Sequence, residues 1–271
     1  MTPSRSSGAG MASSEDKTRG LLIAYDTIAA PGQRVTLVAE LLEDGLLTHP
    51  PLGGEVLLFK ADGRVLGRAM TGGDGRALLS VLPRHGGVST VVVGLAASPR
   101  VTASEATARL FVWDRRRAIV LVSLNALVAR SRSPGLEIPL PRSDAKRPAP
   151  ETGAVQALKE LDRRAHLLYM SGGDRLELPE LHAWMEVHRL PQGPIILLRP
   201  GPMSLARELE RWHREGWTNI RGGIVETAEE AKALTDSKRK AVAAPTVASQ
   251  ERWPEKTVRP KDWSEAARQF R

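Results

Sequence analysis

The pattern of apolar residues changes near Trp113, and this change constrains the fold more than any other feature of the sequence. Residues 20–113 hold short stretches of alternating apolar and polar residues, separated by turns rich in glycine and proline. Such alternation, repeated about every 8–12 residues, is typical of a β-sandwich. After residue 118, apolar stretches alternate with segments of helical period, which favours a parallel sheet covered by helices. The sequence therefore predicts a multidomain chain, with an all-β sandwich followed by a three-layer α/β domain.

The expected elements follow from this periodicity and from the turn residues between them. In the first part, strands are predicted at 21–25, 35–42, 55–60, 65–70, 76–81, 89–95 and 106–113. In the second part, strands are predicted at 118–122, 165–170, 195–199 and 220–225, with helices at about 153–164, 178–189, 203–215 and 228–236.

Four segments organise the chain in this interpretation. Residues 1–19 are small and polar and are predicted to be a disordered N-terminus, followed by the sandwich at 20–113 and the α/β domain at 118–237. A linker rich in proline, serine and arginine covers 130–152 inside the second domain. Residues 238–271 form a basic C-terminal tail, which is either a mobile arm or a strap held by Trp253 and Trp263.

Composition excludes several classes of function. The chain has no cysteine, which excludes disulfides, cysteine-ligated metals and thiol nucleophiles. Its net charge is +8, but aromatic residues make up only 4% and do not alternate with basic ones, which argues against a nucleic-acid surface. No apolar run approaches the roughly 20 residues of a membrane span. We expect a cytoplasmic protein; its oligomeric state is left open, and a protein partner is possible.

Three stretches of the first part are distinctive: Pro31-Gly32-Gln33, the strand from Gly54 to Phe59, and the hairpin from Leu66 to Ala77. Together they resemble bacterial Ig-like domains. The hairpin, with Thr71 and Asp74-Gly75 at its turn, is similar to the one that follows the central aromatic strand in those domains.

The second part contains five stretches in a recognisable order: Ile119–Val128, Ala157–Leu161, His166–Ser171, Leu181–Pro194 and Gly223–Thr227. In this order they resemble a degenerate HAD-type hydrolase domain, of the lipin-like and planctomycete kind. The Leu-Pro-x-Gly-Pro element at Leu190–Pro194 is the most distinctive of them. The resemblance implies a Rossmann-like sheet with a phosphate-ester site at the strand ends.

The resemblance also shows where the chemistry is lost. In the family, a carboxylate nucleophile ends the first strand, a second carboxylate two residues later is the general acid or base, and both hold Mg²⁺. These positions are Ser123 and Asn125 here. A serine hydroxyl has no charge for the cation, and an asparagine cannot shuttle a proton. We therefore expect no family-type catalysis and no cofactor, with Mg²⁺ required only if hydrolysis persists.

The remaining candidate positions concern ligand binding. Ser171 with the amides of Gly172 and Gly173 could hold a phosphate oxygen, although Ser-Gly-Gly is also an ordinary strand-to-helix turn. Arg207, or else Arg211, falls where the family has a phosphate-binding lysine, and Glu226 falls at the last acidic position. His182 and His188 are six residues apart and lie on different faces of a helix, so no metal site is predicted. The ligand-binding residues expected are Ser171, Gly172, Gly173, Arg207 and Glu226.

Three functions are compatible with this interpretation of the sequence. The first is a non-catalytic binding or scaffold protein of HAD type, a pseudo-phosphatase. The second is a hydrolase with residual or altered phosphate-ester activity at the same place. The third is an interaction module in which the sandwich binds another protein. The loss of both carboxylates, at Ser123 and Asn125, favours the first.

Overall fold

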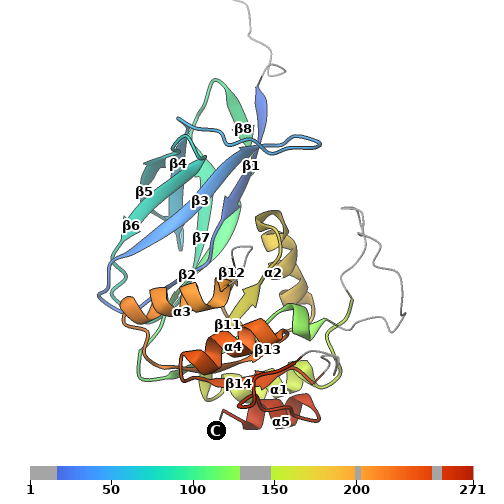
Figure 1. Ribbon diagram of the computed structural model, residues 1–271. Helices are drawn as coiled ribbons and strands as arrows, with labels where there is room; N and C mark the ends of the chain where they lie inside the picture. The colour runs from blue at the N-terminus through green and yellow to red at the C-terminus, as the bar shows by residue number, and fades with distance from the viewer. Residues whose placement is uncertain (1–16, 129–147, 199–202, 246–251, 271) are drawn as a thin grey trace, which may run out of the picture. The chain divides into compact units, whose positions relative to one another are not determined.

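A computed structural model describes residues 17–128, 148–198, 203–245 and 252–270 (Figure 1). Residues 1–16 of the predicted N-terminal segment, and 130–147 of the predicted linker, lie outside this part. The chain divides into two compact units that are not continuous in sequence: one contains 1–24, 38–79 and 92–106, and the other contains 25–37, 80–91 and 107–271. The predicted domain ranges follow the change in secondary structure instead, and they stay predictions.

The N-terminal part is a β-sandwich of two mixed sheets. One sheet has the strand order β6-β3-β1-β8 and the other has the order β2-β9-β7-β4-β5. The β1–β3 and β4–β5 pairs are antiparallel, whereas β1–β8 and β2–β9 are parallel. The bounds are β1 Thr18–Ala24, β2 Thr27–Ala29, β3 Val35–Glu43, β4 Val56–Ala61, β5 Arg64–Met70, β6 Arg76–Val81, β7 Gly87–Leu95, β8 Val101–Ala103 and β9 Ala106–Val112.

Alternation along the strands separates the sandwich core from its surface. In β4, Leu57 and Phe59 are fully buried, and the residues between them are only partly buried. Ile23, Leu41 and Ala77 are buried in the other sheet. A strand presents successive side chains to opposite faces, so each strand contributes one apolar face to the core.

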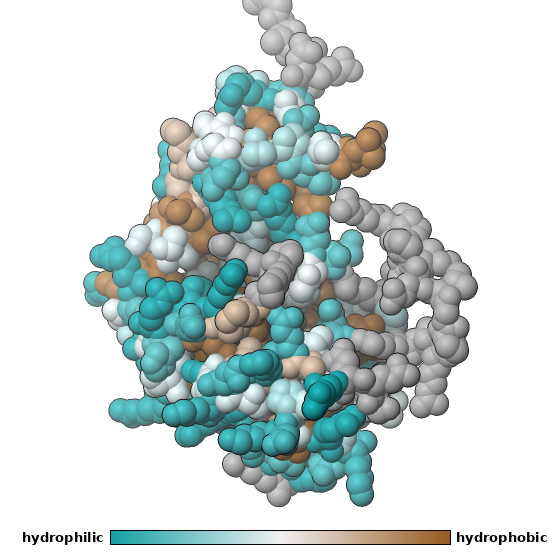
Figure 2. Space-filling view, in the orientation of Figure 1, coloured by the Kyte–Doolittle hydropathy of each residue, from teal (hydrophilic) through white to brown (hydrophobic). Residues whose placement is uncertain are grey.

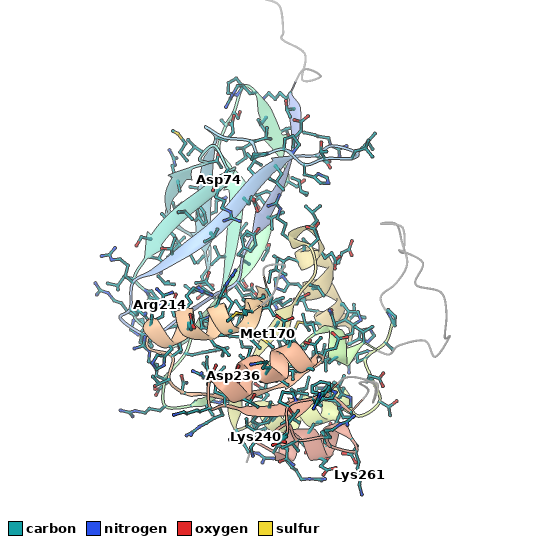
Figure 3. The ribbon with its side chains drawn as sticks, viewed as in Figure 1. Asp74, Met170, Arg214, Asp236, Lys240 and Lys261 are labelled. Carbon is teal, nitrogen blue, oxygen red and sulfur yellow. The ribbon has the colours of Figure 1, made fainter. Side chains whose placement is uncertain are left out.

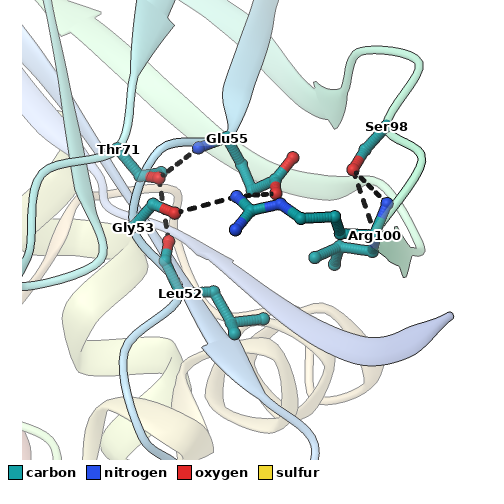
Figure 4. A network of polar contacts seen from close by, with 7 residues as sticks. Leu52, Gly53, Glu55, Thr71, Ser98 and Arg100 are labelled. Carbon is teal, nitrogen blue, oxygen red and sulfur yellow. Dashed lines mark hydrogen bonds and ion pairs between the residues drawn. The ribbon is translucent and has the colours of Figure 1, made fainter.

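A polar network closes one end of the sandwich (Figure 4). The buried carboxylate of Glu55 accepts from the guanidinium of Arg100 at 2.5 Å, and Arg100 also donates to the carbonyl of Gly53. The hydroxyl of Thr71 donates to the carbonyl of Leu52 and accepts from the Glu55 amide. These contacts tie the turn before β4 to the end of β5 and the start of β8.

The C-terminal part is an α/β domain with a five-stranded parallel sheet. The strand order is β12-β11-β10-β13-β14, in which the first strand of the domain lies at the centre. The strands are β10 Ala118–Ser123, β11 Ala165–Ser171, β12 Ile195–Leu197, β13 Ile220–Val225 and β14 Lys240–Ala243; the helices are α1 Ala154–Asp162, α2 Leu178–Val187, α3 Ser204–Arg214, α4 Ala228–Asp236 and α5 Trp263–Arg268.

Helices cover this sheet because their apolar stripes match its buried strands. Helix α1 contacts α5, and α3 contacts α4. Strands β10 and β11 are almost wholly buried, and Met170 of β11 is only 1% exposed. Asp236, Lys240 and Lys261, by contrast, are exposed at the surface (Figure 3). Strands buried on both faces read as continuous apolar runs, which is why 118–122 and 165–170 show no alternation.

The segment predicted as a basic tail contains packed structure. Its first residues form β14, the edge strand of the parallel sheet, and Val258 pairs with Val242 beside it. Trp263 opens α5 and is 3% exposed, whereas Trp253 is partly buried against the apolar core. Of the two alternatives for this segment, the packed strap is therefore the one that its described residues adopt. No helix within the described ranges is both long enough and apolar enough to cross a membrane.

Candidate functional site

The carboxyl ends of the parallel strands meet at one edge of the sheet. From the central strand β10, the chain proceeds outward to β11 and β12 on one side and to β13 and β14 on the other. In sheets of this kind, ligands bind outside the carboxyl ends where the direction of winding reverses. That point lies between β10 and β13, so the residues after Ser123 and after Val225 are the first candidates for a site.

Ser123 ends β10 and is 3% exposed. The next amide, that of Leu124, donates to the carbonyl of Met170 at 2.8 Å, which holds the end of β10 against β11. The chain then turns through a short 3-10 helix from Asn125 to Leu127, and Asn125 is exposed. Neither side chain is a carboxylate, so this strand end supplies a buried hydroxyl and an exposed amide.

Ser171 ends the neighbouring strand β11, one residue beyond the partner of Ser123 in the register. Its hydroxyl is buried and accepts from the Gly173 amide at 3.1 Å. A Cβ on Gly173 would lie 2.9 Å from a carboxylate oxygen of Glu177, whereas one on Gly172 would meet open space. The amide of Gly173 therefore has a partner within its own turn. The predicted phosphate contact at Ser171, Gly172 and Gly173 stays a prediction.

On the other side of β10, α4 follows β13 with a carboxylate at its start. Thr227 is the N-cap, and its hydroxyl accepts from the Glu230 amide at 3.2 Å. The Glu230 carboxylate in turn accepts from the amides of Glu226 and Thr227, at 2.9 and 3.2 Å. Burial raises the pKa of Glu230, and these two amides oppose the rise. The amides of Glu226 and Thr227, which lead into α4, are thus bound by the chain's own carboxylate.

Three of the predicted site residues lie at the ends of adjacent strands, and a fourth lies on a helix. Ser123, Ser171 and Glu226 stand at the ends of β10, β11 and β13, which are neighbours in the sheet. Arg207 is exposed on α3. Arg211, the alternative to Arg207, forms ion pairs with glutamates on its own helix. The ligand roles of these residues stay predictions.

The Leu-Pro-x-Gly-Pro element positions β12 beside β11. The hydroxyl of Tyr169 donates to the carbonyl of Pro191 at 2.9 Å, and the Tyr169 amide donates to the carbonyl of Pro194. A Cβ on Gly193 would lie 2.2 Å from the carbonyl oxygen of Leu167. Only glycine permits this approach, so the element sets how closely the connection crosses β11.

The sequence analysis missed Asp26, a buried carboxylate with three partners from distant parts of the chain. Its side chain is fully buried; Oδ1 accepts from the Arg109 amide at 2.8 Å, and Oδ2 accepts from the Ile195 amide at 2.9 Å. The Nε2 atom of His182 lies 2.9 Å from the same Oδ2. The Arg109 guanidinium also contacts Glu186 of α2. Asp26 thereby joins a turn after β1 to β9, α2 and β12.

Within the part of the chain that the structure describes, no three histidine, aspartate or glutamate side chains gather in an arrangement that could hold a metal ion. Asp26 and His182 are each engaged with the other.

The structure places the chain among two-domain proteins in which a β-sandwich is followed by a doubly wound α/β domain. No family model matches the sequence, and no curated protein matches it. Among solved structures, the fibronectin(III)-like modules of CbhA from Clostridium thermocellum are 14% identical, covering 34% of this chain and 94% of that chain, with a TM-score of 0.25. A CARDB domain from Pyrococcus furiosus, solved with di-metal ions, is 9% identical, covering 36% of this chain and 88% of that chain, with the same TM-score. Likeness at this level carries no argument about function.

Proposed function

We propose that this chain is a non-catalytic binding or scaffold protein, with an Ig-like sandwich and a C-terminal domain of HAD type that has lost its chemistry. The observation that carries the proposal is the pair Ser123 and Asn125, at the end of the central strand where the family pattern places its two carboxylates. Ser123 is also buried, so its hydroxyl has little access to a substrate.

A second observation supports the absence of phosphate-ester turnover. At the start of α4, the Glu230 carboxylate binds the amides of Glu226 and Thr227, which precede the helix, and Glu229 lies in the same first turn. Anionic substrates bind where amides and cations are available. Here negative charge already stands at that position, which favours a role other than phosphoryl transfer.

The proposal is tested by assaying hydrolysis of a generic phosphomonoester with Mg²⁺. The wild-type chain should show no turnover above the Ser123→Ala variant, and calorimetry should find no stoichiometric Mg²⁺ site tighter than about millimolar, because hard cations need several anionic oxygens. Ser89→Ala, a serine in the sandwich, is the matched control.

Two outcomes would contradict the proposal. Turnover that Ser123→Ala abolishes and Ser89→Ala leaves intact would make Ser123 a nucleophile and would establish the alternative, a hydrolase with altered phosphate-ester activity. Turnover that survives both changes would place an active site elsewhere in the chain. The double change Ser123→Asp with Asn125→Asp restores both carboxylates and should produce Mg²⁺ binding before any turnover.

A further inference from the structure

Two adjacent leucines protrude from the sandwich. Leu46 is 100% exposed and Leu47 is 92% exposed, in the loop between β3 and β4. Figure 2 shows that apolar atoms also reach the surface, as brown patches among largely hydrophilic teal ones. Single exposed leucines are ordinary, but two neighbouring ones at a loop tip form a contiguous apolar contact surface. We call Leu46 and Leu47 the leucine tip.

The loop that carries the leucine tip is held by its own backbone. The amide of Glu43 donates to the carbonyl of Pro50 at 2.8 Å, and the Gly45 amide donates to the carbonyl of Glu43 at 3.0 Å. A Cβ on Gly45 would lie 2.3 Å from the carbonyl oxygen of Thr48, so the turn is as tight as glycine allows. A preorganised loop loses little conformational freedom on binding, which favours a role in recognition.

The charges beside the leucine tip are acidic in a chain whose net charge is +8. Glu43 and Asp44 are exposed immediately before it. Asp44 lies 3.9 Å from Arg19 in an exposed pair, which contributes little. Loops that insert into anionic membranes carry lysine and arginine instead. The tip therefore matches an apolar surface with basic residues around it.

This chain has such a surface on the outer face of β4 and β5. Leu57 and Phe59 face the core, so their neighbours along the strands face outward. The register places the outward residues opposite one another: Val56 with Met70, Leu58 with Arg68, and Lys60 with Val65. Val65 is 62% exposed and Met70 is 65% exposed. We call these six residues the β4–β5 face.

We infer that the leucine tip of one molecule docks on the β4–β5 face of a second copy. Leucine side chains would cover Val65 and Met70, and the carboxylates of Glu43 and Asp44 would approach Arg68. The two surfaces are different parts of the molecule (Figure 1), so the contact is heterologous, and a dimer keeps one unused leucine tip on one copy and one unused β4–β5 face on the other. Association therefore continues beyond a dimer into a ring or an open chain.

Sedimentation velocity of the full chain over a range of concentrations measures this association. Two leucines make a small contact, so we expect a dissociation constant of about 0.1 mM and weight-average sedimentation coefficients that rise up to about 1 mM protein. Leu46→Ser or Leu47→Ser should each lower the association constant about tenfold, as a loss of about 1.4 kcal/mol does. Raising the salt concentration should weaken association, because the flanking charges are exposed.

A mixing experiment tests the geometry. The tip variant Leu46→Ser with Leu47→Ser keeps its β4–β5 face, and the face variant Val65→Thr with Met70→Thr keeps its tip and its strand propensity. Each variant alone should be monomeric. An equimolar mixture should form a one-to-one dimer and nothing larger, since only one competent pair of surfaces remains.

A control variant separates the leucine tip from other exposed apolar residues. Val187→Ser changes another exposed apolar residue, on α2, and should associate as wild type. A wild-type chain that stays monomeric to 1 mM (about ten times the expected dissociation constant) would overturn the inference. Wild-type association that the tip variant keeps, or variants that fail to form a dimer when mixed, would also overturn it. Tip-dependent binding of a monomeric chain to phosphatidylcholine–phosphatidylglycerol vesicles would assign the leucines to a membrane instead.

Discussion

Replacing Asp26 by asparagine should destabilise the unit that it joins together. The carboxylate accepts two backbone amides, of Arg109 and Ile195, and contacts Nε2 of His182. An asparagine has one carbonyl oxygen and one amide group, so it can accept from one of the two backbone donors while its own N–H groups face the other. One buried backbone N–H is then left without an acceptor.

The magnitude follows from these contacts. An unsatisfied buried donor costs about 1–3 kcal/mol, and each remaining hydrogen bond loses about 1 kcal/mol because its acceptor is no longer charged. Asp26→Asn should therefore lower the free energy of unfolding by about 3–5 kcal/mol, a large part of the stability of an ordinary domain. His182→Gln keeps a donor near Asp26 and should cost about 1 kcal/mol.

Urea unfolding followed by tryptophan fluorescence measures the effect in the correct unit, because all six tryptophans lie between Trp113 and Trp263. Asp236→Asn is the matched control: this carboxylate forms an exposed pair with Lys232, and its loss should change stability by less than about 0.5 kcal/mol. A cost below about 1 kcal/mol for Asp26→Asn, with an unchanged denaturant slope, would refute the reasoning from its three contacts.

Three further predictions concern stability. Burial lowers the pKa of His166 to about 4, with Arg117 assisting, so between about pH 6.5 and 4 the unfolded chain binds a proton that the folded chain does not. The free energy of unfolding, measured in urea, should therefore fall by about 1–2 kcal/mol as the pH is lowered through that range, a modest loss because the ring is half-exposed. His166→Phe should remove this part of the pH dependence. Gly193→Ala should cost about 3 kcal/mol in urea unfolding, because its Cβ would meet a backbone carbonyl, whereas Gly172→Ala in open space should cost less than about 0.5 kcal/mol. Arg100→Ala leaves the buried carboxylate of Glu55 without its guanidinium partner. It should lower the free energy of unfolding of the sandwich, measured by calorimetry, by about 1–2 kcal/mol.

Periodicity in the sequence predicted the long elements well. The strand at 220–225 and the helix at 228–236 have the predicted bounds in the structure, and the capping box of Thr227 with Glu230 marks where the helix begins. The sequence analysis missed β2, β8 and β14, which span three or four residues each. Strands this short show no measurable alternation, and they form because a longer neighbour offers its free edge.

The sequence likewise predicted one part of the candidate site and not another. The positions of Ser123 and Ser171 at adjacent strand ends follow from the order of strands in a doubly wound sheet, which a sequence can indicate. The contacts of Asp26 could not be predicted, because its partners His182 and Ile195 are 156 and 169 residues away. A single aspartate between two short strands has no pattern, and only tertiary packing shows that it is buried.

The division of the chain into discontinuous units has a consequence for anyone who wishes to express the α/β domain by itself. A fragment that begins at residue 118 would contain the whole parallel sheet, yet it would lack Ile28, Ala30, Phe111 and Trp113, which belong to the same buried cluster as Leu168. It would also expose the apolar atoms that those four side chains cover, and it would leave the Ile195 amide without its Asp26 acceptor. Expressing the α/β domain with its complete core therefore requires either the full chain or a redesigned chain in which residues 25–37 and 80–91 are joined to residues 107–271.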